Sequence, residues 1–269
     1  MLRVFPVNIV ELCSSITSVL LDKVAPRLQR NPLVLALPLQ AVLLLSNLDL
    51  LDPWGDESFQ LTHVPEPLNQ IVFADPMNPP LYNMLLHYWI QLPWMLSPLA
   101  SMRAMSALWA MVATVIIYVL CLRGEKSRFQ VMFLALWVFS PCLLLHARMA
   151  RSYSMELALA CLVICTAPQL TEQLRINWKR LLTHVSSSAA LLYTHYLSGL
   201  AVAAAVCAAF LLKKRFILAA TQATLVAILF VPWVPTFGSS LGNWFHTPYP
   251  YEGGNVISDQ IVRLAYLFV

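Results

Sequence analysis

Residues 49–82 read DLLDPWGDESFQLTHVPEPLNQIVFADPMNPPLY and directly follow an apolar segment at 33–48. This stretch contains six of the thirteen carboxylates in the chain, and no Lys or Arg occurs from Asn31 to Met102. Charged groups are costly inside hydrocarbon, so an acidic loop beside an apolar segment must face water if that segment enters a bilayer. The stretch therefore separates a membrane-embedded part of the chain from a loop at the membrane surface.

The composition supports a membrane protein. The chain is 59% hydrophobic and 11% charged, with a mean hydropathy of +0.69, whereas soluble domains carry about 25% charged residues. The basic residues form short clusters between apolar segments, so the net charge of +4 does not indicate nucleic-acid binding. The six Cys lack C-x-x-C spacing, which argues against a zinc site or a disulfide framework. We predict an all-α polytopic membrane protein.

Eight apolar segments are candidates for membrane spans. They lie at 33–50, 79–99, 103–121, 129–147, 153–169, 181–198, 199–212 and 216–235. A span needs about 20 residues. Prolines at positions 79, 80, 93 and 98 interrupt the second segment, which favours a re-entrant or interface-lying helix there. About seven transmembrane helices are therefore expected, with interfacial helices in the first external loop.

The basic clusters predict the orientation of these spans. They fall at 3–30, 123–128, 175–180 and 213–215, and the positive-inside rule places them in the cytoplasm. Residues 1–32 are then a cytoplasmic amphipathic segment, too charged for a signal peptide. Residues 33–235 form the membrane module, with the acidic loop and interfacial helices at 51–102 outside, and residues 236–269 are external. An eight-span alternative would misplace one basic cluster.

The predicted orientation gathers polar side chains from distant segments on the external face. Arg103 begins one span, and Arg148, Arg151 and Tyr153 lie at the junction of two others. His195 lies in a Tyr-Thr-His-Tyr segment between two further spans. Glu156 is expected to pair with Arg151 or Arg148, because a lone carboxylate within the membrane is unfavourable.

The order of these motifs resembles a known family. The motifs are Asp56–Glu57 after the first span, Asp75 ahead of Pro79–Pro80–Leu81–Tyr82, Arg103, Ala150–Arg151–Ser152–Tyr153 and Tyr193–Thr194–His195–Tyr196. Together they resemble the C-type superfamily of integral-membrane glycosyltransferases, in particular protein O-mannosyltransferases and bacterial aminoarabinose transferases. The resemblance covers about residues 49–237 and corresponds to the N-terminal catalytic half of that family, whose members continue into a further C-terminal part.

The resemblance implies an inverting transfer of a sugar from a polyprenyl-phosphate donor to a lipid, glycan or protein acceptor. Asp56 is the expected general base, with Glu57 as its helper. Arg148, Arg151, His195 and Tyr153 are expected to bind the donor phosphate. Asp75, Asn78, Tyr82 and Arg103 are expected to contact substrate or to order the loop.

Some members of the family also use a divalent metal cation. Glu57, Asp75 and His87 are the candidate ligands in this chain. Asn78 stands where relatives often carry a His, and Met149 and Ala150 precede Arg151 where relatives often carry a Glu. The resemblance further implies a bacterial inner membrane, with the active site on the periplasmic face.

Two other classes of function remain as alternatives. A truncated or non-catalytic membrane scaffold is compatible with the shortness of the chain, as is a minimal enzyme that needs a partner subunit. A transporter would carry charges deep within its spans and an internal repeat, but the charges here cluster at one face and no repeat is visible.

Overall fold

The computed structural model describes residues 31–74, 79–93, 96–172 and 177–239. Every regular element in these ranges is helical, as the composition predicted. The helices are α3 (Leu33–Leu45), α4 (Gly55–His63), α5 (Leu68–Ala74), α6 (Leu81–Ile90), α7 (Pro98–Ile117), α8 (Ser127–Val138), α9 (Pro141–Ala147), α10 (Tyr153–Thr171), α11 (Trp178–Leu192), α12 (Tyr196–Leu212) and α13 (Phe216–Phe230). A π-helical turn, Tyr118–Leu122, extends α7, and a 3₁₀ turn, Val231–Trp233, follows α13. The amphipathic segment expected at 1–32 and most of the external segment expected at 236–269 lie outside the described residues.

Three helical stretches within the described residues are long and apolar enough to cross a membrane: Pro98–Leu122, Tyr153–Thr171 and Phe216–Ser239. The pair α8 and α9 makes a fourth if it counts as one span bent by 52°. The helices α3 and α12 are apolar but shorter, with 13 and 17 residues. The chain is thus a helical membrane protein, and three to four of the seven expected spans meet the length criterion.

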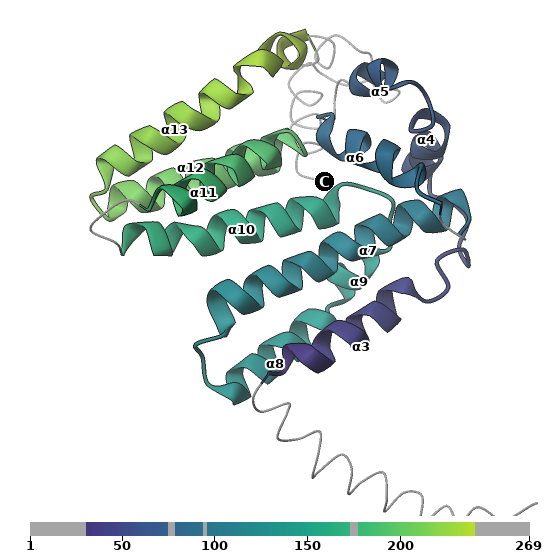
Figure 1. Cartoon of the computed structure of the whole chain (residues 1–269), viewed down its shortest axis with the longest axis horizontal. Coiled ribbons are helices and arrows are strands. Elements are labelled where there is room, and N and C mark those ends of the chain that lie inside the picture. The colour runs from purple at the N-terminus through teal and green to yellow at the C-terminus, as the bar shows by residue number, and fades with distance from the viewer. Residues whose placement is uncertain (1–30, 75–78, 94–95, 173–176, 240–269) are drawn as a thin grey trace, which may run out of the picture.

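Helices α7 and α10 form the centre of the bundle. Helix α3 and the bent pair α8–α9 pack on one side of α7, and α11, α12 and α13 follow α10 on the other (Figure 1). Ala104, Ala107 and Ala110 form a buried row along α7. Such small side chains let helix backbones approach closely where hydrophobic burial gives little driving force, as in a membrane.

Three short helices occupy the segment between α3 and α7. Helices α4, α5 and α6 contain 9, 7 and 10 residues, and even the longest spans only about 15 Å at 1.5 Å per residue. The expected helix at 79–99 is therefore α6 alone. Helix α7 starts anew at Pro98, where the Ser97 hydroxyl accepts a hydrogen bond from the Ala100 N–H. The side chain of Trp89 on α6 donates to the Ser101 carbonyl at 2.8 Å, which ties α6 to α7.

The acidic loop and the basic cluster at 213–215 lie at opposite ends of α10. Near the start of α10, the Ala150 N–H donates to the Glu57 carboxylate at 2.7 Å. At its end, the Arg215 guanidinium donates to the Thr171 carbonyl at 2.7 and 3.1 Å. Arg215 belongs to the basic cluster at 213–215, so the bundle has an acidic-loop end and a basic end, as the charge pattern predicted.

A tight turn joins α11 to α12 at the acidic-loop end. A Cβ atom at Gly199 would lie 2.7 Å from Leu192 Cα, closer than two carbon atoms can pack. Glycine is required here because the two helices touch backbone to backbone. This contact fixes the turn 193–195 beside α6, where the Leu81 N–H donates to the Tyr193 carbonyl at 3.0 Å.

Candidate functional site

A buried ion pair anchors the acidic loop to the bundle. Glu57 on α4 is 1% exposed and Arg103 on α7 is 6% exposed. The guanidinium donates through Nη2 to Oε2 at 2.7 Å and through Nε to Oε1 at 3.0 Å. This two-pronged geometry is the strongest form of an arginine–carboxylate contact.

Backbone groups complete the coordination of Glu57. Ala150 N–H donates to Oε1 at 2.7 Å, and Trp54 N–H donates to Oε2 at 3.1 Å. Burial alone would raise the pKa of Glu57, but the hydrogen bonds from Arg103, Ala150 and Trp54 outweigh it and hold the pKa below its ordinary value. Glu57 is therefore a buried, fully hydrogen-bonded anion. With both oxygens engaged, the structure favours a positioning role for Glu57 over the expected role as catalytic helper or metal ligand.

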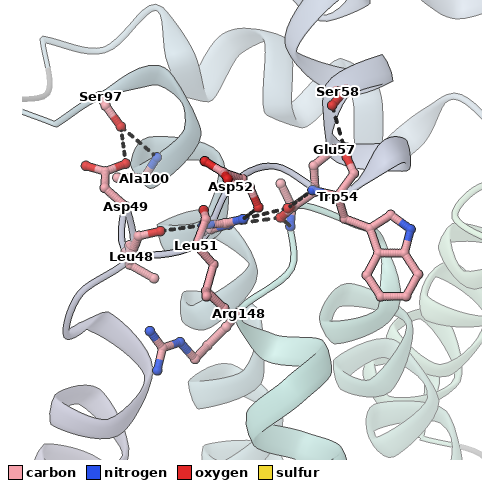
Figure 2. A network of polar contacts seen from close by, with 12 residues as sticks. Leu48, Asp49, Leu51, Asp52, Trp54, Glu57, Ser58, Ser97, Ala100 and Arg148 are labelled. Carbon is pink, nitrogen blue, oxygen red and sulfur yellow. Dashed lines mark hydrogen bonds and ion pairs between the residues drawn. The ribbon is translucent and has the colours of Figure 1, made fainter.

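Arg103 uses its remaining N–H groups to hold the chain between α3 and α4. It donates to the carbonyls of Leu48 at 2.6 Å, Leu51 at 2.9 Å and Asp52 at 3.2 Å. Figure 2 shows Leu48, Leu51, Trp54 and Glu57 converging on one network. Asp49 contributes separately, because its carboxylate accepts the Ser97 hydroxyl at the start of α7. Arg103 thus fixes the path of the chain between α3 and α4.

Asp56 points away from this network. It neighbours Glu57 in the first turn of α4, and adjacent helical residues project about 100° apart. The Asp56 side chain is 55% exposed and lies 3.5 Å from the Arg151 guanidinium, which is 16% exposed. The structure therefore brings the expected base and one expected phosphate-binding arginine together at the acidic-loop end.

Helices α6 and α7 support the backbone of Arg151. The Arg151 carbonyl accepts the Ser106 hydroxyl at 3.2 Å, and Ser106 in turn contacts Tyr82 Oη at 3.1 Å. Burial raises the pKa of Tyr82 well above its ordinary value, so its hydroxyl stays protonated. Tyr82 is therefore linked to the Arg151 backbone through Ser106, a contact that no sequence pattern indicated.

His195 and Glu156 form a second polar cluster at this end. The Glu156 carboxylate accepts the Ser152 hydroxyl at 2.7 Å and the Ser198 hydroxyl at 2.8 Å, and its Oε2 lies 3.9 Å from His195 Nδ1. The expected pairing of Glu156 with Arg151 or Arg148 is wrong, since Arg151 pairs with Asp56. The reason is that the turn 193–195 and the first turn of α12 lie beside the start of α10, where His195 and Ser198 are the partners of Glu156. Ser152 and Ser198 were not predicted as partners of Glu156, because their spacing matches no recognisable motif.

Arg148 and Tyr153 are placed apart from Arg151. The Arg148 guanidinium donates to the carbonyls of Ser46 at 2.9 Å and Asn47 at 3.1 Å, where α3 ends, and Figure 2 shows it turned away from Glu57. It borders a cavity of about 480 Å³ with Leu51 and Leu145. The Tyr153 ring instead packs edge-on against His146, with centroids 5.0 Å apart. The four side chains expected to bind one phosphate therefore contact four different sets of partners.

The candidate metal ligands do not converge within the described residues. His87 Nδ1 lies 2.8 Å from the Val64 carbonyl and Nε2 lies 2.7 Å from the Gln91 side chain, while Glu57 is held by Arg103. Asp75 and Asn78 lie outside the described residues. No group of three His, Cys, Asp or Glu side chains suited to a metal ion occurs in the part of the chain that the structure describes.

Asp56 and Arg151 form the candidate site at the acidic-loop end of the bundle. A solvent-accessible carboxylate lies beside a guanidinium, on a loop held by a buried ion pair, at the polar end of a membrane bundle. Such a pair can accept a proton and bind an anion. The chain matches no model of a known protein family, no curated protein and no solved structure.

Proposed function

We propose that the protein is an inverting glycosyltransferase of the C-type superfamily, which moves a sugar from a polyprenyl-phosphate donor to an acceptor hydroxyl. One observation carries the proposal: the exposed Asp56 carboxylate lies 3.5 Å from the Arg151 guanidinium. The motif order in the sequence supports the same reading, because both residues belong to motifs that resemble this superfamily.

Asp56 is the proposed general base. It accepts the proton of the acceptor hydroxyl while the acceptor oxygen forms a bond to the anomeric carbon. The bond from that carbon to the phosphate oxygen breaks on the opposite side, and polyprenyl phosphate leaves with the electron pair. A phosphate is already a weak base, so no second carboxylic acid is needed, in contrast to glycosidases.

Arg151 is the proposed binding group for the donor phosphate. Its planar guanidinium suits two phosphate oxygens and can stabilise the negative charge that develops as the phosphate leaves. Asp56 is the partner of Arg151 in the free protein. The incoming phosphate therefore displaces the Asp56 carboxylate from Arg151, which leaves this carboxylate free to act as the base. His195, whose side chain is 33% exposed, lies on the neighbouring turn and is the second candidate donor to the phosphate.

Glu57, Arg103 and Tyr82 are proposed to position these groups. Glu57 and Arg103 fix the first turn of α4, which carries Asp56. Tyr82 and Ser106 support the Arg151 backbone. The described residues offer no metal site of three ligands, so no step is assigned to a divalent cation.

The proposed orientation places the basic end of the bundle in the cytoplasm and Asp56 on the external, periplasmic face. It takes α3, α7, the bent pair α8–α9, α10, α11, α12 and α13 as seven crossings. The shorter helices α3, α11 and α12, with 13, 15 and 17 residues, then require local thinning of the bilayer or shelter by neighbouring helices.

The test is sugar transfer by the purified full chain, supplied with radiolabelled polyprenyl-phosphate sugars. Asp56→Asn should lower kcat by roughly 10²- to 10⁴-fold, the contribution of a general base. Asp52→Asn is the matched control, because Asp52 is also exposed and only its backbone carbonyl contacts Arg103. It should retain the rate of the wild type.

Two results would contradict the proposal at different levels. Equal rates for Asp56→Asn and the wild type would remove Asp56 as the base. No transfer by the wild type with any labelled donor would reject the enzyme and leave a membrane scaffold as the function.

A further inference from the structure

Residues 46–54 join α3 to α4 and expose large apolar side chains. Leu50, Leu51 and Trp54 are 75%, 69% and 63% exposed, in a stretch that belongs to neither helix. All three border the cavity of about 480 Å³ beside Arg148, so they form one patch. An exposed apolar patch of this kind marks a contact surface for a protein or a membrane.

The backbone of the same segment is turned toward the protein. Five of the seven carbonyls from Ser46 to Asp52 accept hydrogen bonds from arginine side chains: Ser46 and Asn47 from Arg148, and Leu48, Leu51 and Asp52 from Arg103. The Trp54 N–H donates to Glu57, and Figure 2 shows the Trp54 indole pointing away from this network. Polar backbone inside and apolar side chains outside are the reverse of a loop that faces water.

A lipid environment accounts for this arrangement. Hydrocarbon supplies no hydrogen-bond donors, so non-helical backbone at membrane depth is stable only where the protein itself satisfies it. In water the same carbonyls would be hydrated without the two arginines. Trp is also enriched at the membrane–water interface, where its ring meets hydrocarbon and its N–H meets polar groups. The segment therefore fits the boundary between the head groups and the acyl chains.

The apolar surface continues from this segment onto α3 and α9. Val42 and Leu45 on α3 are exposed, and Leu145 on α9 is exposed and borders the same cavity. Helix α3 has 13 residues and rises about 20 Å, less than the roughly 30 Å of a hydrocarbon core. Leu50 and Leu51 prolong its apolar surface past its last turn. This continuity with a membrane helix favours the bilayer over a second copy of the chain as the partner.

We propose that residues 46–54 lie in the interfacial layer of the bilayer. Leu50 and Leu51 contact the upper acyl chains, Trp54 lies among the head groups, and the exposed Asp52 faces water. Asp56 follows Trp54 by two residues, so its carboxylate stands at the level of the lipid phosphates. The membrane contact goes beyond the proposed sugar transfer and holds whether or not the protein is an enzyme.

Fluorescence quenching tests the proposal. A genetically encoded fluorescent amino acid replaces Leu51 in the full chain, which is reconstituted in phosphatidylcholine nanodiscs. One quencher is a phosphatidylcholine with a nitroxide near the top of one acyl chain, and the other is aqueous iodide. The nitroxide lipid should quench the probe at Leu51, and quenching by iodide should be lost there.

Two further positions calibrate the measurement. Val42, which is 65% exposed on α3, is the control for contact with lipid. Glu66, which is exposed between α4 and α5, is the control for contact with water and lies in the same acidic loop. The probe at Leu51 should respond as the probe at Val42 does. Leu50 replaces Leu51 as the test position if size-exclusion chromatography shows that the Leu51 variant is not monodisperse.

Two outcomes would overturn the proposal. Iodide quenching at Leu51 equal to that at Glu66 would place the segment in water. Quenching by neither reagent would show that protein covers the segment, either another part of the chain or a second copy.

Discussion

Arg103 and Glu57 are 46 residues apart in the sequence, yet they form a buried two-pronged ion pair with contacts of 2.7 and 3.0 Å. The same arginine holds three carbonyls of the chain between α3 and α4. Asp56, next in the chain to Glu57, remains exposed beside Arg151. The buried pair thus determines where the candidate base stands.

Glu57→Gln should destabilise the fold. Removing one member of a buried ion pair typically costs about 3–5 kcal/mol, because the partner charge is left uncompensated. The measurement is the melting temperature in detergent, with Asp52→Asn as an exposed control that should change stability by less than about 0.5 kcal/mol.

The Glu57 pair should also make stability depend on acid pH. The pKa of Glu57 is held below its ordinary value of 4.5 in the folded state. As the pH is lowered, Glu57 therefore takes up a proton in the unfolded state before it does so in the folded state. Its contribution to folding stability is complete above pH 4.5 and is lost as the pH falls through the folded-state pKa. Between pH 7 and pH 3 the melting temperature should fall less steeply with decreasing pH for Glu57→Gln than for the wild type. Identical slopes for the two proteins would show that another carboxylate is responsible.

Arg151 and Arg148 should respond differently to the same substitution. Arg151→Gln should raise KM for the donor roughly 10- to 100-fold, since a hydrogen bond to a charged group contributes about 1.5–3 kcal/mol. Arg148→Gln should leave this KM unchanged, because Arg148 donates to the Ser46 and Asn47 carbonyls instead. Its loss should lower stability by about 1 kcal/mol. Equal effects on KM would mean that both arginines reach the donor phosphate.

Gly199→Ala should destabilise the turn between α11 and α12. The added Cβ would lie 2.7 Å from Leu192 Cα and 2.8 Å from its backbone nitrogen, and forced repacking of this kind costs about 1–3 kcal/mol. Because His195 lies in that turn, transfer activity should also fall. Gly124→Ala is the control, since nothing lies within 4 Å of its Cβ position. An unchanged melting temperature for Gly199→Ala would show that the two helices can separate without cost.

Much of the architecture was predictable from local chemistry. Apolar segments with few charges predicted a helical membrane protein, and Pro93 and Pro98 predicted the interruption before α7. The basic residue Arg215 was placed correctly at the end away from the acidic loop, because charge clusters constrain the ends of membrane helices. The number of spans was less predictable. Hydropathy along a sequence marks apolar segments but not where a helix begins, ends or bends, as it does between Val138 and Pro141.

The candidate site was predictable only as a set of residue types at one end of the bundle. The roles within that set depended on contacts between distant segments. Glu57 and Asp56 look equivalent in the sequence, and Arg148 and Arg151 lie only three residues apart. The pairing of Glu156 with Ser152 and Ser198 depends on the turn returning from α11, which no local pattern encodes.

The sequence by itself determined that this is a helical membrane protein with an acidic loop at one end and the basic cluster at 213–215 at the other, because hydropathy and charge act residue by residue. Only the tertiary structure decided that Glu57 is buried as an anchor and that Asp56 is left exposed. The reason is geometric. Adjacent residues on a helix point in different directions, so Arg103 on α7 reaches Glu57 but not Asp56.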